Sequence, residues 1–375
     1  MSNVLPLRDI IFGKTDAFNE LKEFGIDWFI KAFFPYEKYE IDSFVRGNSY
    51  FICGEKGTGK TAFLRYLQCV LSEDTTSLII PIRFKSDIDN EERKSMVRAS
   101  INIKEVEAEG LNEFKEGDAI TVWQIYILNK LFSKIAEAGE YDFFKQTKEY
   151  SEIKQLLKVV YPEYKDNIVP RIKKGQLKVN AHLLEMLDAE LQLEIGAEER
   201  VATINFNRVA KTIISKFSKL CYNKSKVYIL FDELELSIQS EKSHLRDIKL
   251  VRDLIIAIER LNEICKEKQF DIHIVCSVRT EVLKSVHSAG YEINKCIEDY
   301  GIMMSWYQKG GNYEDNKLLK LIENKIIASE EIHGICEHGD IWEKYFPDEI
   351  NNVPTKRYIL NYCWMHPRDR SEERR

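Results

Sequence analysis

The sequence predicts an α/β fold, a doubly wound parallel sheet of about five strands with a helical insertion and a C-terminal helical lid. Short apolar runs alternate along the chain with longer segments of helical periodicity, which is the pattern of strands joined by crossover helices. Four of the apolar runs show little alternation of polar and apolar residues. Such runs are typical of strands that are covered by side chains on both faces.

Five segments are predicted as strands, and the last of them has the weakest pattern: residues 49–53, 77–84, 226–231, 271–277 and 301–306. The helical segments between them include residues 60–71, 120–138 and 245–268. In the helix predicted at 245–268, apolar residues recur every three or four positions. They therefore fall on one side of the helix, which we expect to face the sheet.

The alternation divides the chain into segments of different character. We expect an N-terminal helical flank, an α/β core in two parts, a helical insertion rich in Lys, Glu and Tyr, and a C-terminal helical lid. The corresponding residues are 1–48, then 49–138 and 201–310, then 139–200, and finally 311–375. Residues 86–117 are charged and weakly periodic, so we expect them to decorate the sheet.

Composition restricts the class of protein. The 375 residues include 55 Lys+Arg and 61 Asp+Glu, and 44% are hydrophobic, as in ordinary globular proteins. The net charge of −6 argues against a protein that coats nucleic acid with its whole surface, although a local basic groove stays possible. No apolar run approaches the roughly 18–20 residues of a membrane span. The eight scattered cysteines are typical of reduced thiols, so we expect a soluble cytoplasmic protein.

Residues 54–61 match the phosphate-binding pattern G-x-x-x-x-G-K-[ST] and lie between a predicted strand and a predicted helix. The glycines let the loop curl so that its backbone N–H groups form an anion-binding nest at the helix N-terminus. We expect the nucleotide phosphates to contact Gly54, Glu55, Lys56, Gly57, Thr58, Gly59, Lys60, Thr61 and Ala62. Within this set, Lys60 is expected to reach the β- and γ-phosphates, and the Thr61 hydroxyl to bind Mg²⁺.

An acidic pair, Asp232 and Glu233, follows five apolar residues of a predicted strand. Ligands of open α/β sheets bind beyond the carboxyl ends of the strands, so Asp232 is placed to hold Mg²⁺. Glu233 is then placed to orient and polarise an attacking water. A solvated acidic turn would be the commoner explanation in isolation, but the phosphate-binding loop in the same chain favours the catalytic one.

The predicted strand at 271–277 ends in two further polar residues, Ser277 and Arg279. Both can reach a γ-phosphate, and a positive charge there would stabilise the charge that develops during phosphoryl transfer. The alternative, that Arg279 pairs with a nearby acid at the strand end, stays open. Residues 280–356 contain no arginine, so this segment offers none to act on the nucleotide of a neighbouring subunit. That absence favours a role for Arg279 within its own chain.

Three other classes of nucleotide-binding protein are disfavoured. The chain has no Asn-Lys-x-Asp, with which GTPases recognise guanine, and no LSGGQ-like signature of ABC ATPases. A metabolite kinase does not need a water-activating Glu after the Asp. The acidic pair therefore favours ATP hydrolysis over phosphoryl transfer to another acceptor.

Together these motifs resemble the ASCE division of P-loop ATPases, specifically its AAA+/STAND-like branch. The flanks are similar to a family of bacterial P-loop ATPases with an N-terminal FG-x-x-DA-x-x-E, here residues 12–20, and a C-terminal Pro-Arg-Asp, here residues 367–369. The resemblance implies ATP and Mg²⁺ as ligands and nominates Arg368 as a nucleotide-sensing residue of the lid. It also implies a place in bacterial defence or stress systems.

We therefore predict a Mg²⁺-dependent ATPase in which Lys60, Glu233 and Arg279 are catalytic. It would act as a nucleotide-driven conformational switch or assembly platform, as a homo-oligomer or together with a separate effector protein such as a nuclease in antiviral defence. Two alternatives stay open: a DNA- or RNA-stimulated AAA+-like motor or loader, and a structural ATP-binding scaffold with negligible turnover. Glu233 argues against the scaffold, and the net charge of −6 argues against the motor.

Overall fold

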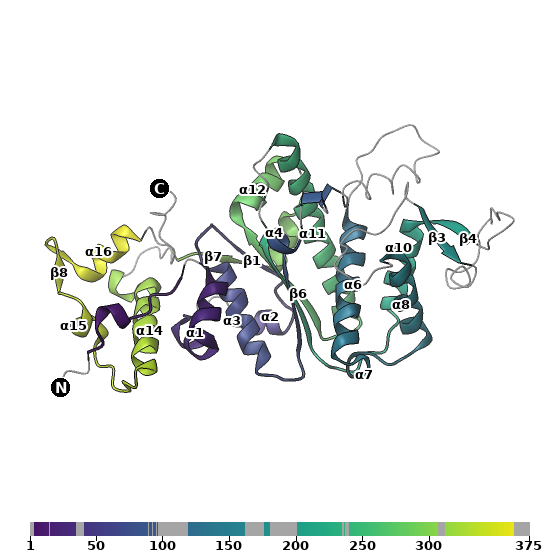
Figure 1. Ribbon diagram of the computed structural model, residues 1–375. Coiled ribbons are helices and arrows are strands. Elements are labelled where there is room, and N and C mark those ends of the chain that lie inside the picture. Colours follow the sequence, from purple (N-terminus) through teal and green to yellow (C-terminus); the bar gives the residue numbers. More distant parts are fainter. Residues whose placement is uncertain are drawn as a thin grey trace.

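The computed structural model describes most of the chain. The described residues are 4–363 apart from 15, 35–40, 89, 92, 95, 97–118, 162–175, 181–200, 235, 237–239, 291 and 307–311. Figure 1 shows an elongated molecule with a parallel sheet near its centre. The C-terminal helices lie at one end, and helices with a small β-hairpin lie at the other.

The central sheet has five strands, namely β1 (Phe51–Gly54), β2 (Leu78–Arg83), β5 (Val227–Leu234), β6 (Ile272–Arg279) and β7 (Gly301–Met304). Their order is β2-β5-β6-β1-β7, and all four neighbouring pairs are parallel, so the predicted parallel sheet is confirmed. From β1 the chain continues to β2 on one side of the sheet, and it later reaches β7 on the other side.

Helices cover both faces of the sheet, as the continuous apolar runs predict. The main ones are α3 (Lys60–Ser72) on one face and α6 (Ile120–Ala138) and α11 (Glu241–Glu267) on the other. Alternate residues of β5 belong to different hydrophobic clusters. Ile229 packs in the cluster that contains α6 and α11, and Leu230 packs in the cluster that contains α3. The α/β fold is therefore wound on both sides of its sheet.

One helix begins earlier than the periodicity indicates. The sequence predicts its start at residue 245, whereas α11 begins at Glu241. Ser240 precedes the helix and accepts a hydrogen bond from the Ser243 backbone N–H, and the Ser243 side chain bonds back to Ser240. This capping box satisfies two N–H groups of the first turn, so the helix extends by one polar turn.

The segment expected to be a helical insertion also contains β-structure. Helices α7 (Glu140–Phe143) and α8 (Lys148–Val160) are followed by strand β3 (Gln176–Asn180). This strand pairs antiparallel with β4 (Val201–Asn205), which precedes helix α10 (Phe206–Phe217). The hairpin crosses the boundary predicted at residue 200. Its short strands alternate polar and apolar residues, which is a strand pattern that the helical expectation overlooked.

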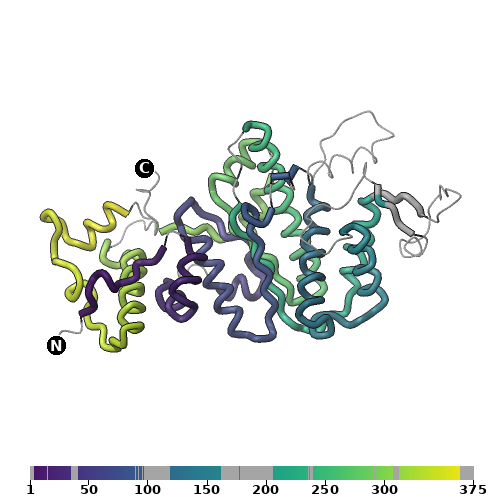
Figure 2. Tube along the Cα trace, viewed as in Figure 1, coloured from purple at the N-terminus to yellow at the C-terminus, as the bar shows by residue number. Residues whose placement is uncertain are grey.

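The two ends of the described chain pack together. The N-terminal helices are η1 (Leu7–Asp9), α1 (Ala17–Ala32) and α2 (Ile41–Val45). The C-terminal unit contains η2 (Tyr313–Asp315), α14 (Lys317–Ile332), α15 (Ile341–Tyr345) and α16 (Thr355–Tyr362), with a short antiparallel pair, β8 (Glu349–Ile350) and β9 (Val353–Pro354). Helix α1 contacts both α14 and α3, and Figure 2 shows the first segment of the trace running beside the last helices. No helix among the described residues is both long and apolar enough to span a membrane.

Two leucines of α11 provide a test of the packing. Leu254 is fully buried, whereas Leu245 is 50% exposed on the same helix. We expect Leu254→Ala to lower the free energy of unfolding by about 2–5 kcal/mol, because it removes apolar contacts and leaves a cavity. The matched change Leu245→Ala should alter it by about 0.5 kcal/mol or less. Chemical denaturation of both variants checks this, and equal losses would contradict the assignment of the buried face.

Candidate functional site

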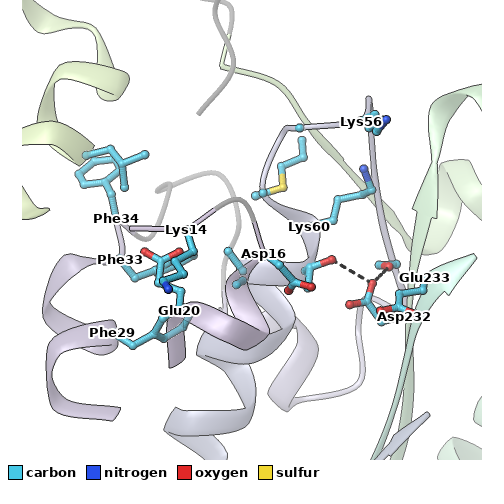
Figure 3. Close-up of a pocket in the computed structure, with 18 of the residues that line it drawn as sticks. Lys14, Asp16, Glu20, Phe29, Phe33, Phe34, Lys56, Lys60, Asp232 and Glu233 are labelled. Atoms are coloured by element: carbon cyan, nitrogen blue, oxygen red, sulfur yellow. Dashed lines mark hydrogen bonds between the residues drawn. The ribbon is translucent and has the colours of Figure 1, made fainter. Parts of the chain in front are cut away.

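A cavity of about 360 Å³ lies beyond the carboxyl ends of β1, β5 and β6. Figure 3 shows Lys60, Asp232 and Glu233 on one side of it, and Phe29, Phe33 and Phe34 on the other, with Lys14 and Glu20 beside these aromatic residues. Of the predicted site residues, the structure brings ten to its walls: Lys56, Gly57, Gly59, Lys60, Thr61, Ala62, Asp232, Glu233, Ser277 and Arg279.

The loop between β1 and α3 depends on its glycines. Gly57 and Gly59 adopt left-handed backbone conformations with φ of 89° and 92°, which side chains disfavour. At Gly54 a Cβ atom would lie 2.7 Å from Thr58 Oγ1 and 2.9 Å from the backbone O of Met304, so no larger residue fits. Gly59 is the N-cap of α3, and no side chain caps the first N–H groups of that helix. They are therefore available to an anion.

Lys60 is the first residue of α3, and its side chain contacts the loop. Its Nζ donates hydrogen bonds to the backbone O of Gly54 at 2.9 Å and of Glu55 at 2.7 Å, and the residue is buried. Burial, together with the nearby charge of Arg279, lowers the pKa of Lys60 from 10.5 to about 8. An anion bound at the loop would offset this cost and raise the pKa again.

A bulge in β5 positions the acidic pair. The strand continues to Leu234, so the prediction that it ends at residue 231 is wrong, and Asp232 and Glu233 lie inside it. The register to β6 shifts here, so that two residues of β5 face the single residue Ser277. Ser277 Oγ donates to Asp232 Oδ1 at 2.5 Å, and Thr61 Oγ1 donates to the same oxygen at 3.4 Å. These two bonds are the dashed lines in Figure 3.

The oxygens around Asp232 fit a magnesium ion. Asp232 is 5% exposed, and its Oδ2 is buried without a hydrogen-bond partner among the described residues. Those residues contain no cluster of three or more His, Cys, Asp or Glu side chains that could hold a metal alone. Mg²⁺ is typically held by one or two carboxylates together with water and substrate phosphates. Asp232 and Thr61 therefore suit a magnesium ion that arrives with a phosphate ligand.

Glu233 lies at the cavity wall in a strained backbone conformation, with φ of 59°. Its Oε2 accepts a hydrogen bond from Ser86 Oγ at 2.8 Å. Ser86 belongs to α4 (Phe84–Asp87), a short helix that follows β2 directly. The carboxylate is therefore bonded to the helix at the sheet edge in this structure.

Arg279 is the last residue of β6 and lies opposite Gly54 in the register of the sheet. The next helix, α12 (Thr280–Ser288), contributes Glu281, whose Oε1 accepts a hydrogen bond from the Lys56 backbone N–H at 3.4 Å. The predicted lid residue Arg368 lies outside the described residues.

Sequence reasoning missed the far wall of the cavity. Phe29 of α1, together with Phe33 and Phe34 just after it, supplies aromatic surface, and α14 supplies Leu321 and Lys325. The family-like stretch at residues 12–20 was the available signal, but the resemblance assigned it no place in the fold.

An ion pair explains three residues of that stretch. Lys325 Nζ donates to Glu20 Oε1 at 3.0 Å and to the backbone O of Phe12 at 2.8 Å. Gly13 lies directly against this pair, with φ of 91°, and a Cβ there would collide with both Glu20 and Lys325. Asp16 caps α1 by accepting a hydrogen bond from the Phe18 N–H. The stretch therefore joins α1 to α14 at the cavity wall.

Trp306 is a second residue that the sequence did not indicate. It lies two positions after β7, and its buried Nε1 donates a hydrogen bond to the backbone O of Thr58 at 2.8 Å. The indole thus ties the segment that leads to the C-terminal unit to the middle of the loop at 54–61.

Comparisons with protein-family models, with curated proteins and with solved structures found no match to this chain.

The hydrogen bond of Trp306 can be tested against a second tryptophan. Trp306→Phe should destabilise the protein by about 1–3 kcal/mol more than Trp28→Phe, because it leaves the buried Thr58 carbonyl without this donor. Trp28 is equally buried, but its Nε1 has no hydrogen-bond partner among the described residues, so its replacement costs packing only. Denaturation curves give both losses in the free energy of unfolding. A loss for Trp306→Phe no greater than that for Trp28→Phe would contradict a stabilising hydrogen bond from Trp306 to Thr58.

Proposed function

We propose that the protein is a Mg²⁺-dependent P-loop ATPase that binds and hydrolyses ATP. One observation carries the proposal: Lys60, Thr61, Asp232 and Arg279 come from three separate segments and line one cavity beyond the carboxyl ends of the strands. That cavity lies at the ends of the neighbouring strands β1 and β6. The chain continues from β1 to β2 on one side of the sheet and from β6 to β7 on the other, and ligands of open α/β folds bind at such a point.

In this proposal the loop amides and Lys60 bind the phosphates, and Thr61 and Asp232 hold Mg²⁺. The ion would neutralise phosphate charge when it is bound. Ser277 fixes the Asp232 carboxylate through its short hydrogen bond, which leaves Oδ2 as the oxygen for the metal or its water shell. Arg279 stabilises negative charge that develops on the transferred phosphoryl group.

Glu233 orients and polarises the attacking water in this mechanism. Its Oε2 is bonded to Ser86 in the structure, and the water would bind at Oε1 or take the place of the serine hydroxyl.

The aromatic residues of the cavity support a nucleoside ligand. Phe29, Phe33 and Phe34 lie opposite the charged residues, and Phe33 stacks on Tyr66 with ring centroids 4.3 Å apart. A flat base beside aromatic side chains and a phosphate chain at the loop fit these two halves. The preference for ATP over GTP follows from the absence of Asn-Lys-x-Asp.

The wider role is a nucleotide-driven switch or assembly platform in the cytoplasm that acts on a separate effector, as the family resemblance implies for antiviral defence. The N-terminal flank, the core and α14 all line the cavity. A ligand there would contact all three, which supports a role in which the ligand changes their relative positions. All eight cysteines are free thiols, which suits a reducing compartment.

Mg·ATP turnover by purified protein tests the proposal. Glu233→Gln should lower turnover by roughly 10²–10⁴-fold while ATP still binds, because the water loses its base. Lys60→Ala should lose ATP binding, and Glu241→Gln, which changes an exposed acid outside the cavity, should leave turnover unchanged.

Three outcomes separate the alternatives. Negligible turnover in wild type and in Glu233→Gln, with ATP still bound, would refute the stand-alone ATPase in favour of the structural scaffold. Strong stimulation of turnover by added DNA or RNA would favour the motor. Undiminished ATP binding by Lys60→Ala would refute the phosphate site itself.

The lowered pKa of Lys60 predicts a pH dependence of ATP affinity. Bound phosphate raises this pKa, so binding takes up a proton once the free protein has lost it. Affinity should be constant below pH 8 and fall by up to about tenfold per pH unit between pH 8 and 10.5. Lys60→Arg stays charged throughout, so its affinity, although weaker, should show no such slope. Calorimetric titrations over this range check both profiles, and parallel profiles would contradict the role of Lys60.

A further inference from the structure

A second cavity, of about 370 Å³, lies at the opposite end of the sheet from the candidate ATP site. Tyr50, immediately before β1, and His273, the second residue of β6, form part of its wall. Lys266 near the end of α11 and Lys224 before β5 contribute as well. Nothing in the proposed ATPase mechanism uses these residues.

The lining carries an excess of positive charge. Arg46, Lys224 and Lys266 are its cations, and Asp271 is the one carboxylate among the described lining residues. Asp271 Oδ1 is bonded to His273 Nε2 at 2.6 Å, and its single negative charge leaves the three cations in excess. Among the described residues, Arg46 pairs with the exposed Asp42, at 3.4 Å. Such a concentration of cations in one hollow attracts anions.

A buried hydroxyl in the same wall lacks a hydrogen-bond partner. Tyr50 is 2% exposed, and its OH has no partner among the described residues. The ring is fixed by stacking on Tyr300, with centroids 4.5 Å apart, so rotation of the side chain cannot easily supply a partner. Buried hydroxyl groups are almost always bonded, which makes this one a candidate ligand contact.

Gly47 keeps the histidine side of the cavity open. Its backbone is left-handed, with φ of 67°, and a Cβ there would lie 2.5 Å from His273 Nδ1. Any other residue at this position would collide with the imidazole and reduce the hollow. Across the cavity, the rings of Tyr222 and Phe270 lie 5.4 Å apart and provide an apolar floor.

We propose that this cavity binds a small molecule that carries more than one phosphate group. Three cations around one cavity complement a ligand with several phosphate charges better than a ligand with a single carboxylate. The volume is close to that of the candidate ATP site, which is the size of a metabolite, and the aromatic floor accommodates an apolar part of the ligand.

The two cavities lie at opposite ends of the same two strands. β6 begins beside the second cavity at Ile272 and ends at Arg279 in the candidate ATP site. β1 begins next to Tyr50 and ends at Gly54, whose backbone O accepts a hydrogen bond from Lys60. A ligand at the second cavity would therefore contact the start of the strands whose ends carry catalytic groups. The inference goes beyond the proposed ATPase and does not depend on it.

Calorimetric titration with inorganic tripolyphosphate tests the second site. Wild-type protein is expected to bind two molecules, and Lys60→Ala to retain one. Adding Lys224→Glu and Lys266→Glu to Lys60→Ala should weaken the retained site by at least about tenfold, because two attractive charges become repulsive. Orthophosphate, with one phosphate group, should bind this site more weakly than tripolyphosphate.

The matched control adds Lys211→Glu and Lys295→Glu to the Lys60→Ala background. These lysines are exposed and lie outside the cavity, so the net charge changes equally while the site is preserved. Retained affinity in this control, with loss in the cavity variant, supports the proposal. Binding by Lys60→Ala weaker than about 1 mM, or an equal loss in the control, would overturn it.

Discussion

The bulge in β5 is the constraint on which the rest of the candidate site depends. In a regular strand, Asp232 and Glu233 would point to opposite faces of the sheet. The extra residue removes that alternation, so both line the same cavity. It also brings Asp232 against Ser277 of β6 and Thr61 of α3, and a single buried carboxylate thereby links two strands and the helix after the loop. Its other oxygen, Oδ2, has no hydrogen-bond partner in the described part of the chain, and in the proposed mechanism it is the oxygen for the magnesium ion.

The far wall of the cavity is formed by the N-terminal flank and α14, so the site includes residues from outside the α/β core. Lys325 of α14 bonds Glu20 and Phe12 of the N-terminal flank, and Ser329 one turn later accepts a hydrogen bond from the Ile11 N–H. The width of the cavity is therefore set by how α1 and α14 sit together. Trp306, in the segment between β7 and the C-terminal unit, is bonded to the loop itself. A change in the position of α14 thus alters both halves of the site.

Local patterns predicted the sheet and much of the near wall. Lys60, Asp232 and Arg279 each follow or end an apolar run, and parallel strands bring such ends to one edge. The far wall could not be predicted in this way, because Glu20 and Lys325 are separated by 305 residues and their pairing depends on tertiary packing. The bulge escaped prediction for a related reason, since two acidic residues in sequence do not reveal the register between strands.

The left-handed backbone conformation of Glu233 lowers the stability of the fold, while the proposed mechanism requires its carboxylate. A residue other than glycine held there costs of order 1–3 kcal/mol, and glycine would relieve the strain. The substitution that best suits the backbone is thus the one that deletes the carboxylate. A laboratory selection for thermostability alone should enrich Glu233→Gly, whereas a selection for the proposed ATP turnover should purge it. If the two selections have opposite outcomes at this position, they identify it as one where stability is lost in favour of activity, and no structure with a bound ligand is needed.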